Sequence, residues 1–372
     1  MSFKQYTENQ QFNLQINRFV NDFYESDERV SSDLEKIVPN LTDTESWYAQ
    51  WNNMAEYRES IGDLDLASIY YQASEFYLSL EDPKENLAYS KYKKLFYETY
   101  TDWNFEYNDV PYGDSSLPSV KLIIPNAKET LVVFAGYDSF MEEMVKAMSY
   151  LKYIAYNIII FDGPGQGGAL RRGLKLVAEW ENPGKTIFDF YKLNNATILG
   201  VSFGGYLAMR AAAFEKRINK VICFDIFYSF FDTLKMSTSA NIYSQILNLL
   251  NNDKRVELDN LVYRLMSKSI DFEWKISKGM ANTGATTPYS LLKEFKKYDM
   301  TDLGEHINQE VLLLAGSEDQ YIPLSRIYQI QKELKNAKTI TSKIFNSPSG
   351  GEQHCQAGHR ELAFDAIKKF LA

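Results

Sequence analysis

Residues 197–205 read Thr-Ile-Leu-Gly-Val-Ser-Phe-Gly-Gly, and this stretch decides the fold. An apolar run leads into Gly200-Val201-Ser202-Phe203-Gly204, and the amphipathic run from Tyr206 to Ala213 follows directly. A G-x-S-x-G pattern between a strand and a helix forces the serine into a tight turn, where its hydroxyl projects above the sheet. The context therefore favours a nucleophilic Ser202 over a bystander serine in a glycine-rich turn.

Short β-rich runs alternate with helical patterns around this stretch. The predicted strands lie at 120–124, 130–134, 157–161, 197–199, 221–224, 311–314 and 338–345. The predicted helices between them lie near 140–152, 203–215, 323–335 and 358–371. Several of the strands are continuous apolar runs, which is typical of strands that are buried on both faces of a parallel sheet. We therefore expect an α/β fold with a mostly parallel sheet and helices on both faces.

Two other parts of the chain are helical in pattern. Residues 227–300 contain no good strand, and we expect them to form a helical insertion that caps the sheet edge. Residues 1–110 contain 9 Lys+Arg and 21 Asp+Glu, whereas the rest of the chain contains 31 and 28. This step in charge, together with Pro111 and Gly113, predicts a boundary near residues 103–118, where Asp102-Trp103 leads in. We expect an N-terminal helical domain at 1–110 and an α/β domain at 111–372.

A carboxylate that could assist Ser202 follows the predicted strand at 311–314. At the end of such a strand, a carboxylate can hold an imidazole in one tautomer and stabilise its charged form. We predict Asp319 for this role because a short loop and the helix-starting Pro323 come after it. Glu318 is the close competitor, and the plainer alternative is that Asp319 only caps the next helix.

The imidazole must come from one of three histidines. His354 lies in a loop between the last predicted strand and the last helix, after the acid in the chain. His306 precedes the acid, and His359 is expected in the first turn of the final helix, where it would point aside. We therefore predict that His354 is the base.

Backbone N–H groups should stabilise the oxyanion that such a serine generates. Phe203 follows the nucleophile and would supply one donor, and Tyr137, just after the strand at 130–134, is the best candidate for the other. The alternative for Tyr137 is an ordinary strand–helix turn. The glycine-rich run Asp162-Gly-Pro-Gly-Gln-Gly167 lacks the Lys-Ser/Thr of a phosphate loop and fails the dinucleotide fingerprint, so we do not expect a nucleotide cofactor there.

Composition excludes several classes of protein. The chain has 372 residues, a net charge of −9 and 45% hydrophobic residues, so we expect a folded core and neither nucleic acid nor membrane as main partner. Two cysteines and three histidines show no zinc-type spacing, and no metal or other cofactor is expected. Cys223 and Cys355 argue for a reducing compartment, and the N-terminal stretch does not resemble a secretory signal, which together predict a cytoplasmic protein. We expect Cys355 to be a small buried residue.

The motifs at 162–167, 200–204 and 352–356 together resemble the α/β-hydrolase superfamily. Within it, they are similar to the branch of 2,6-dihydroxypseudooxynicotine hydrolase and the fermentation–respiration switch proteins, often labelled acylaminoacyl-peptidase-like. The chain order Ser202, Asp319, His354 fits this superfamily. The helical patterns at Trp47, Trp51 and 66–77 resemble the helical domain of that branch, so the resemblance covers most of the chain.

The resemblance implies a hydrolase with a Ser–Asp–His triad and a helical segment that covers the site. The expected reaction is hydrolysis of an ester or amide in a small molecule or short acyl-peptide, and C–C bond hydrolysis is the alternative. A regulatory binding protein on the same scaffold is a further alternative. We expect the helices at 44–100 and the insertion at 227–300 to wall an apolar pocket above Ser202, unless helices 44–100 dock elsewhere and form a dimer or partner surface.

Overall fold

The structure is a computed structural model and describes residues 3–100 and 104–372. Met1 and Ser2, which begin the stretch examined for a secretory signal, lie outside the described residues. So do Asp102 and Trp103, which begin the expected domain boundary. Among the residues that are described, no helix is both long and apolar enough to cross a bilayer.

One eight-stranded sheet forms the centre of the molecule, with the strand order β1-β2-β4-β3-β5-β6-β7-β8. The neighbouring strands from β4 to β8 pair in parallel, whereas β1 pairs antiparallel with β2 and β2 antiparallel with β4. The prediction of a mostly parallel sheet is therefore confirmed. The strands are β1 (Phe105–Tyr112), β2 (Ser115–Leu122), β3 (Glu129–Phe134), β4 (Tyr156–Phe161), β5 (Ala196–Val201), β6 (Ile218–Phe224), β7 (Glu310–Gly316) and β8 (Thr339–Phe345).

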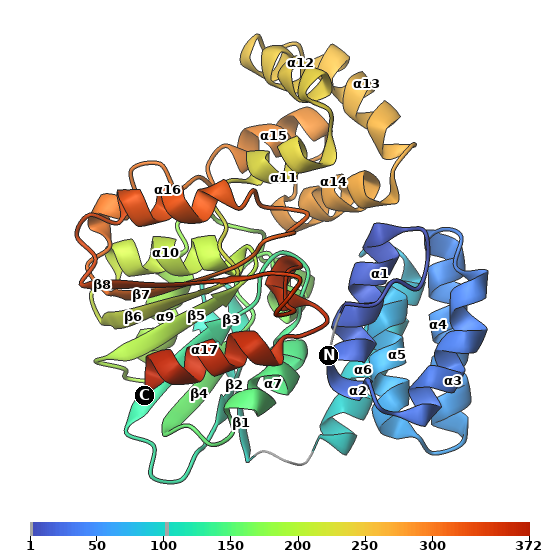
Figure 1. Ribbon diagram of the computed structural model, residues 1–372, viewed down its shortest axis with the longest axis horizontal. Coiled ribbons are helices and arrows are strands. Elements are labelled where there is room, and N and C mark those ends of the chain that lie inside the picture. Colours follow the sequence, from blue (N-terminus) through green and yellow to red (C-terminus); the bar gives the residue numbers. More distant parts are fainter. Residues whose placement is uncertain (1–2, 101–103) are drawn as a thin grey trace.

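Helices cover both faces of this sheet (Figure 1). Helix α10 packs along β5 and β6 on one face, and α17 and α7 lie on the other. The apolar residues of β4 are all buried, and those of β5 are buried up to Val201, which is half-buried, as expected for strands between two layers of helices. The helices of this part are α7 (Met141–Ala147), α8 (Gly167–Arg171), α9 (Glu181–Phe190), α10 (Gly204–Phe214), α16 (Ser325–Glu333) and α17 (Glu361–Leu371), with short turns η3 (Met148–Leu151), η4 (Gly304–His306) and η5 (His354–Gln356).

The N-terminal helices pack beside the sheet (Figure 1). Asp43 and Asp82 accept hydrogen bonds from backbone N–H groups and so begin α4 and α6. The aromatic stripes pack between the helices, as in the ring contacts of Trp47 with Trp51 (5.5 Å) and of Trp51 with Tyr70 (5.4 Å). These helices, named together the N-terminal helices, are α1 (Gln10–Ile16), η1 (Asn17–Asn21), α2 (Asp22–Tyr24), α3 (Glu28–Ile37), η2 (Val38–Asn40), α4 (Thr44–Ser60), α5 (Leu64–Glu75) and α6 (Pro83–Thr99).

The insertion is helical and lies above the sheet edge, as the sequence predicts (Figure 1). Its members, named together the cap helices, are α11 (Phe230–Ser237), α12 (Ala240–Asn251), α13 (Arg255–Met266), α14 (Ile270–Thr283) and α15 (Pro288–Phe295).

Strand β1 crosses the predicted division between residues 110 and 111. The net charge placed residues 105–110 in the helical part, but these residues pair with β2 in the sheet. The change in net charge along the chain reflects which side chains are exposed, not which structural unit they belong to. β1 is an edge strand whose side chains are mostly exposed or half-buried. The division into two domains stays a prediction, and the helical part ends at Thr99.

Candidate active site

Ser202 lies in the sharp turn between β5 and α10. Its backbone φ is +61°, a left-handed conformation that is strained for a residue with a side chain. Its N–H donates to the carbonyl of Phe224 at 2.7 Å, which ties the turn to the end of β6. A side chain at Gly204 would meet the carbonyl of Ala135 at 2.7 Å, so only glycine fits this close approach to β3. The predicted strand–turn–helix context of Ser202 is therefore confirmed.

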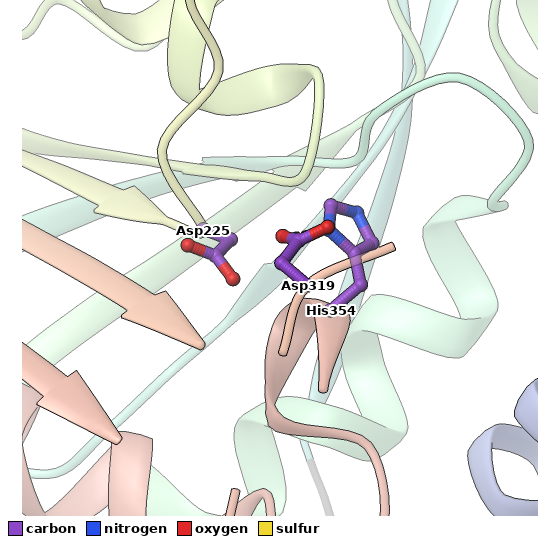
Figure 2. Close-up of side chains that lie close together, drawn as sticks. All are labelled: Asp225, Asp319 and His354. Carbon is purple, nitrogen blue, oxygen red and sulfur yellow. Dashed lines mark hydrogen bonds and ion pairs between the residues drawn. The ribbon is translucent and has the colours of Figure 1, made fainter. Parts of the chain in front are cut away.

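The structure brings Ser202, His354 and Asp319 into one chain of hydrogen bonds. The Oγ of Ser202 lies 2.7 Å from Nε2 of His354, and Nδ1 of His354 lies 2.7 Å from Oδ2 of Asp319. The other oxygen of Asp319 accepts the N–H groups of Tyr321 and Ile322, at 2.7 and 3.0 Å. These two bonds fix the carboxylate, which in turn fixes the imidazole ring. Figure 2 shows the carboxylate of Asp319 turned toward the ring of His354.

The alternatives that the sequence left open lie away from this chain of hydrogen bonds. Glu318 is exposed and bonds to Ser347 through its carboxylate. His306 is exposed, and its ring lies 3.8 Å from Glu305. His359 precedes the final helix, one turn beyond His354, and its Nδ1 is buried without a hydrogen-bond partner among the described residues. Of the residues considered, Asp319 and His354 alone have the geometry to serve Ser202.

The charge on His354 is controlled by its surroundings. Burial opposes protonation, but the negative charge of Asp319 outweighs burial and raises the pKa of His354 well above its ordinary value. The Asp319 carboxylate requires a proton on Nδ1, so in the neutral ring Nε2 is left to accept a proton from the hydroxyl of Ser202.

A second carboxyl group, Asp225, lies beside Asp319 and was not anticipated from the sequence (Figure 2). It follows β6 directly, is fully buried, and accepts the N–H groups of Ile226 (2.8 Å) and Cys355 (3.3 Å). Burial, followed by the charge of Asp319, raises the pKa of Asp225 to about 8. The signal that identified Asp319, a carboxylate at the end of an apolar strand, is also present in Val221-Ile-Cys-Phe-Asp225 and could have found it.

Asp225, Asp319 and His354 could be considered as metal ligands, since one ligand atom of each lies within 4.8 Å of the others. Metal binding needs deprotonated carboxylates and a free imidazole nitrogen. Here Nδ1 of His354 and Asp319 bond to each other, and the raised pKa of Asp225 keeps a proton on that group near neutral pH. The cluster therefore suits proton transfer better than a cation.

The predicted oxyanion donors lie next to each other. A side chain at Gly136 would come within 3.0 Å of both the backbone nitrogen of Phe203 and the Cβ of Ser202, so the turn before Tyr137 touches the serine turn. Within the described parts of the chain, neither the N–H of Tyr137 nor that of Phe203 donates a backbone hydrogen bond. Both donors remain available beside Ser202.

A cavity opens above Ser202. Three parts of the chain line it: the sheet part, the cap helices and the first N-terminal helix. Its walls are mainly apolar and aromatic, among them Tyr137, Met144, Phe227, Phe230, Leu234, Trp274, Ile276, Phe295 and Tyr321. The predicted contribution of residues 227–300 to an apolar pocket is therefore confirmed.

The predicted contribution of helices 44–100 to the cavity is wrong. The N-terminal residues that line it are Leu14, Gln15 and Arg18, from α1 and η1. Rings of helices 44–100 pack against one another and, through Phe76, against Trp274 of the cap helices, but no residue from 44 to 100, all of which the structure describes, is among those that line the cavity. Cys355, expected to be buried, is only half-buried and also lines the cavity, because a left-handed φ of +50° turns its backbone.

No family model matches the chain. Among curated proteins, it is 26% identical to the hydrolase acrC of Aspergillus aculeatus in an alignment that covers 70% of this chain and 72% of that protein. It is 24% identical to the hydrolyase poxO of Penicillium oxalicum in an alignment that covers 88% of each chain.

Two solved structures share the fold over almost the whole length. AbyA5 superposes with a TM-score of 0.71 at 17% identity, over 98% of this chain and 95% of the other. The 2,6-dihydroxy-pseudo-oxynicotine hydrolase superposes with a TM-score of 0.67 at 16% identity, over 95% and 94%. Because the coverage is almost complete, the shared fold includes the N-terminal helices and the cap helices as well as the sheet.

Proposed function

We propose that the chain is an α/β-hydrolase of the branch of 2,6-dihydroxypseudooxynicotine hydrolase, and that it acts as a serine hydrolase on an acyl ester or amide. The observation that carries this proposal is the pair of 2.7 Å hydrogen bonds from Ser202 to His354 and from His354 to Asp319. The half-buried hydroxyl opens to a cavity, so a substrate carbonyl can reach it. Relatives that are named as hydrolases support the general reaction class.

The proposed mechanism has two steps of acyl transfer. His354 takes the proton of Ser202 at Nε2 as the hydroxyl attacks the carbonyl carbon, and Asp319 stabilises the charged ring. The N–H groups of Phe203 and Tyr137 receive the oxyanion. The leaving alcohol or amine takes its proton from His354, and a water molecule activated by the same ring then releases the acid. Because the pKa of His354 is raised, we expect the rate to increase as the pH rises above neutral.

The apolar walls of the cavity favour a small or medium acyl group with apolar or aromatic character. Rings from the sheet part and from the cap helices can pack against such a group. The polar groups that face the cavity are largely engaged with one another, such as Arg18 with Glu143, so they offer little to a strongly charged acyl group.

Replacement of the serine tests the proposal. Ser202→Ala should lose turnover of p-nitrophenyl acetate by several orders of magnitude, because the nucleophile is removed. It should also lose labelling by a fluorophosphonate probe, which reacts only with an activated serine. Ser60→Ala, at an exposed position on α4, is the matched control and should keep both. Full activity in Ser202→Ala would refute the assignment, and absence of labelling in the wild-type protein would favour a binding protein on a hydrolase scaffold.

Hydrolysis of a C–C bond in a ketone or diketone is the second candidate function. The fold shared with 2,6-dihydroxy-pseudo-oxynicotine hydrolase over 95% of this chain is the reason to test C–C bond hydrolysis. The same three side chains would act, and only the bond that is cut would differ. A parallel assay of acyl esters, acyl-peptide amides and β-diketones separates the candidates, since a C–C hydrolase should prefer the diketones.

A further inference from the structure

The glycine-rich loop that follows β4 bonds directly to the turn that carries Tyr137. Its sequence, Asp162-Gly-Pro-Gly-Gln166-Gly, does not suit nucleotide binding, and the proposed reaction leaves it without a role. The side chain of Gln166 is buried, and its Nε2 donates to the carbonyls of Ala135 (2.6 Å) and Gly136 (2.9 Å). Both acceptors precede Tyr137 in the chain.

The orientation of the Gln166 amide follows from its contacts. Its Oε1 accepts the N–H of Gly163 at 3.0 Å, and the backbone N–H of Gln166 donates to the carbonyl of Gly163 at 2.9 Å. The loop therefore fixes the amide oxygen, and the amide nitrogen can only face the two carbonyls of the neighbouring turn.

The bond to Gly136 bears on the oxyanion site because of peptide geometry. The carbonyl of Gly136 and the N–H of Tyr137 belong to one planar trans peptide, in which the two groups point in opposite directions. A donor that holds the carbonyl of Gly136 on one side therefore turns the N–H of Tyr137 to the other side. That turn packs against Ser202 and Phe203, as the close approach at Gly136 shows.

The rest of Tyr137 is held by the cap. Its hydroxyl donates to the carbonyl of Lys275 at 2.6 Å, and its own carbonyl accepts Nδ2 of Asn282 at 2.7 Å. The side chain and the following peptide are thus fixed from α14, whereas the preceding peptide, which carries the N–H, is fixed by Gln166.

We propose that Gln166 is a positioning residue that orients the Gly136–Tyr137 peptide so that its N–H can stabilise the oxyanion formed at Ser202. This inference rests on the proposed serine hydrolase function. Gln166 does not touch the substrate and acts only through the peptide it holds. The glycine-rich loop thereby gains a role in the reaction, which is to supply two fixed donors behind the oxyanion site.

Two substitutions test this role. Gln166→Glu keeps the shape but places a carboxylate oxygen against two carbonyl oxygens, and Gln166→Met keeps the length and adds no charge. We expect kcat for p-nitrophenyl acetate to fall ~10- to 100-fold in both, with KM nearly unchanged, because a misplaced oxyanion donor affects the transition state more than the bound ester. Gln166→Met decides the question if Gln166→Glu folds poorly.

Gln309 provides matched controls. Its side chain is also buried, accepts the N–H of Asn308 (2.8 Å) and donates to the carbonyl of Ala212 (2.9 Å). Gln309 precedes β7, at the end of the strands opposite to the one that carries Ser202. Gln309→Glu and Gln309→Met should lower the melting temperature by amounts comparable to those of the Gln166 variants and leave kcat unchanged.

A pair of ketone inhibitors distinguishes positioning from general damage. Ser202 can add to 2,2,2-trifluoroacetophenone, forming an Oγ–C bond and an oxyanion while its hydroxyl proton passes to Nε2 of His354, whereas acetophenone binds without this step. In the Gln166 variants we expect weaker inhibition by the trifluoromethyl ketone, in proportion to the fall in kcat, and unchanged inhibition by acetophenone. Unchanged kcat in Gln166→Met, or equal loss for both ketones, would overturn the inference. Activity that survives Ser202→Ala would instead overturn the proposed function on which it rests.

Discussion

The N-terminal helices and the cap helices both reach the cavity beside Ser202, but they attach to the sheet part through different chemistry. The N-terminal helices combine ring contacts, such as that of Tyr89 with Phe140 (5.1 Å), with ion pairs that are largely shielded from solvent. Arg18 bonds to both oxygens of Glu143 (2.8 and 2.7 Å) and to Asp138 (3.0 Å), and Asp22 pairs with Arg360 at 3.3 Å. Buried ion pairs of this kind depend strictly on geometry, because an unmatched charge is costly.

The cap helices attach largely through rings. Phe230 contacts Phe203 of the sheet part at 4.5 Å and stacks on Phe295 at 4.1 Å, while the pair of Arg326 and Asp232 is the main ionic contact at their start. Apolar packing tolerates a change of shape better than a buried ion pair tolerates the loss of a partner. We therefore expect the attachment of the cap helices to tolerate changes of side-chain shape that the ion pairs of the N-terminal helices do not tolerate.

Removal of the guanidinium of Arg18 should give the largest loss of folding stability. Arg18→Met leaves the buried carboxylate of Glu143 and the half-buried carboxylate of Asp138 without their cationic partner, and we expect a loss of ~3–5 kcal/mol of folding stability. Thermal unfolding at pH 7 measures it. The double variant Arg18→Met with Glu143→Gln should recover part of this loss, since one of the unmatched charges is then removed.

Arg29→Met is the control for this prediction. Arg29 also bonds to carboxylates, Asp27 and Asp63, but its side chain is 42% exposed. Exposed pairs contribute little, so we expect a change of at most ~0.5 kcal/mol. Equal losses in the two arginine variants would show that burial of the ion pair does not distinguish the N-terminal attachment.

A smaller effect, on stability and on substrate choice, is expected on the cap side. Phe230→Leu keeps an apolar contact but loses the stacking on Phe295, which should cost ~0.5–1.5 kcal/mol of stability. Because Phe230 lines the cavity, KM for p-nitrophenyl benzoate should rise ~3- to 10-fold, an amount in keeping with a loss of this size, while KM for p-nitrophenyl acetate stays unchanged. Phe190→Leu, at an exposed ring on α9, should change neither ester. Equal changes for both esters would mean that the cap does not select the acyl group.

The sheet and the three site side chains were predictable because their signals are local. Apolar runs mark the strands. Ser202 follows such a run directly, and Asp319 follows another after two further residues. His354 follows the last strand by a short loop, and few histidines compete with it. Strand ends in a parallel sheet converge at one edge, so residues far apart in the chain could be expected to meet there.

The positions of the N-terminal helices and the cap helices around the cavity were harder to predict, because they depend on contacts between distant segments. Leu14, Gln15 and Arg18 look like any helix surface until the contacts of Arg18 with Asp138 and Glu143 are known. Strand β1 was missed because its side chains are largely polar and Pro111 interrupts the pattern. The contact of Gln166 with Gly136 depends on how closely two loops approach, which spacing along the chain does not encode.

An effect that appears only when the pH is changed should again belong to the N-terminal helices. Burial of Glu75 on α5 raises its pKa to about 7, against opposing charges that include Arg171. The unfolded chain ionises this group near pH 4.5, so the folded protein loses stability as the pH rises from there to about 7, and no further above that. Glu75→Gln removes this loss. Its melting temperature should exceed that of the wild-type protein on the order of 5 °C at pH 8, with a gap that narrows toward pH 5. Glu81→Gln, at an exposed position before α6, should show no such gap, and a gap independent of pH in Glu75→Gln would mean that the effect comes from packing and not from ionisation.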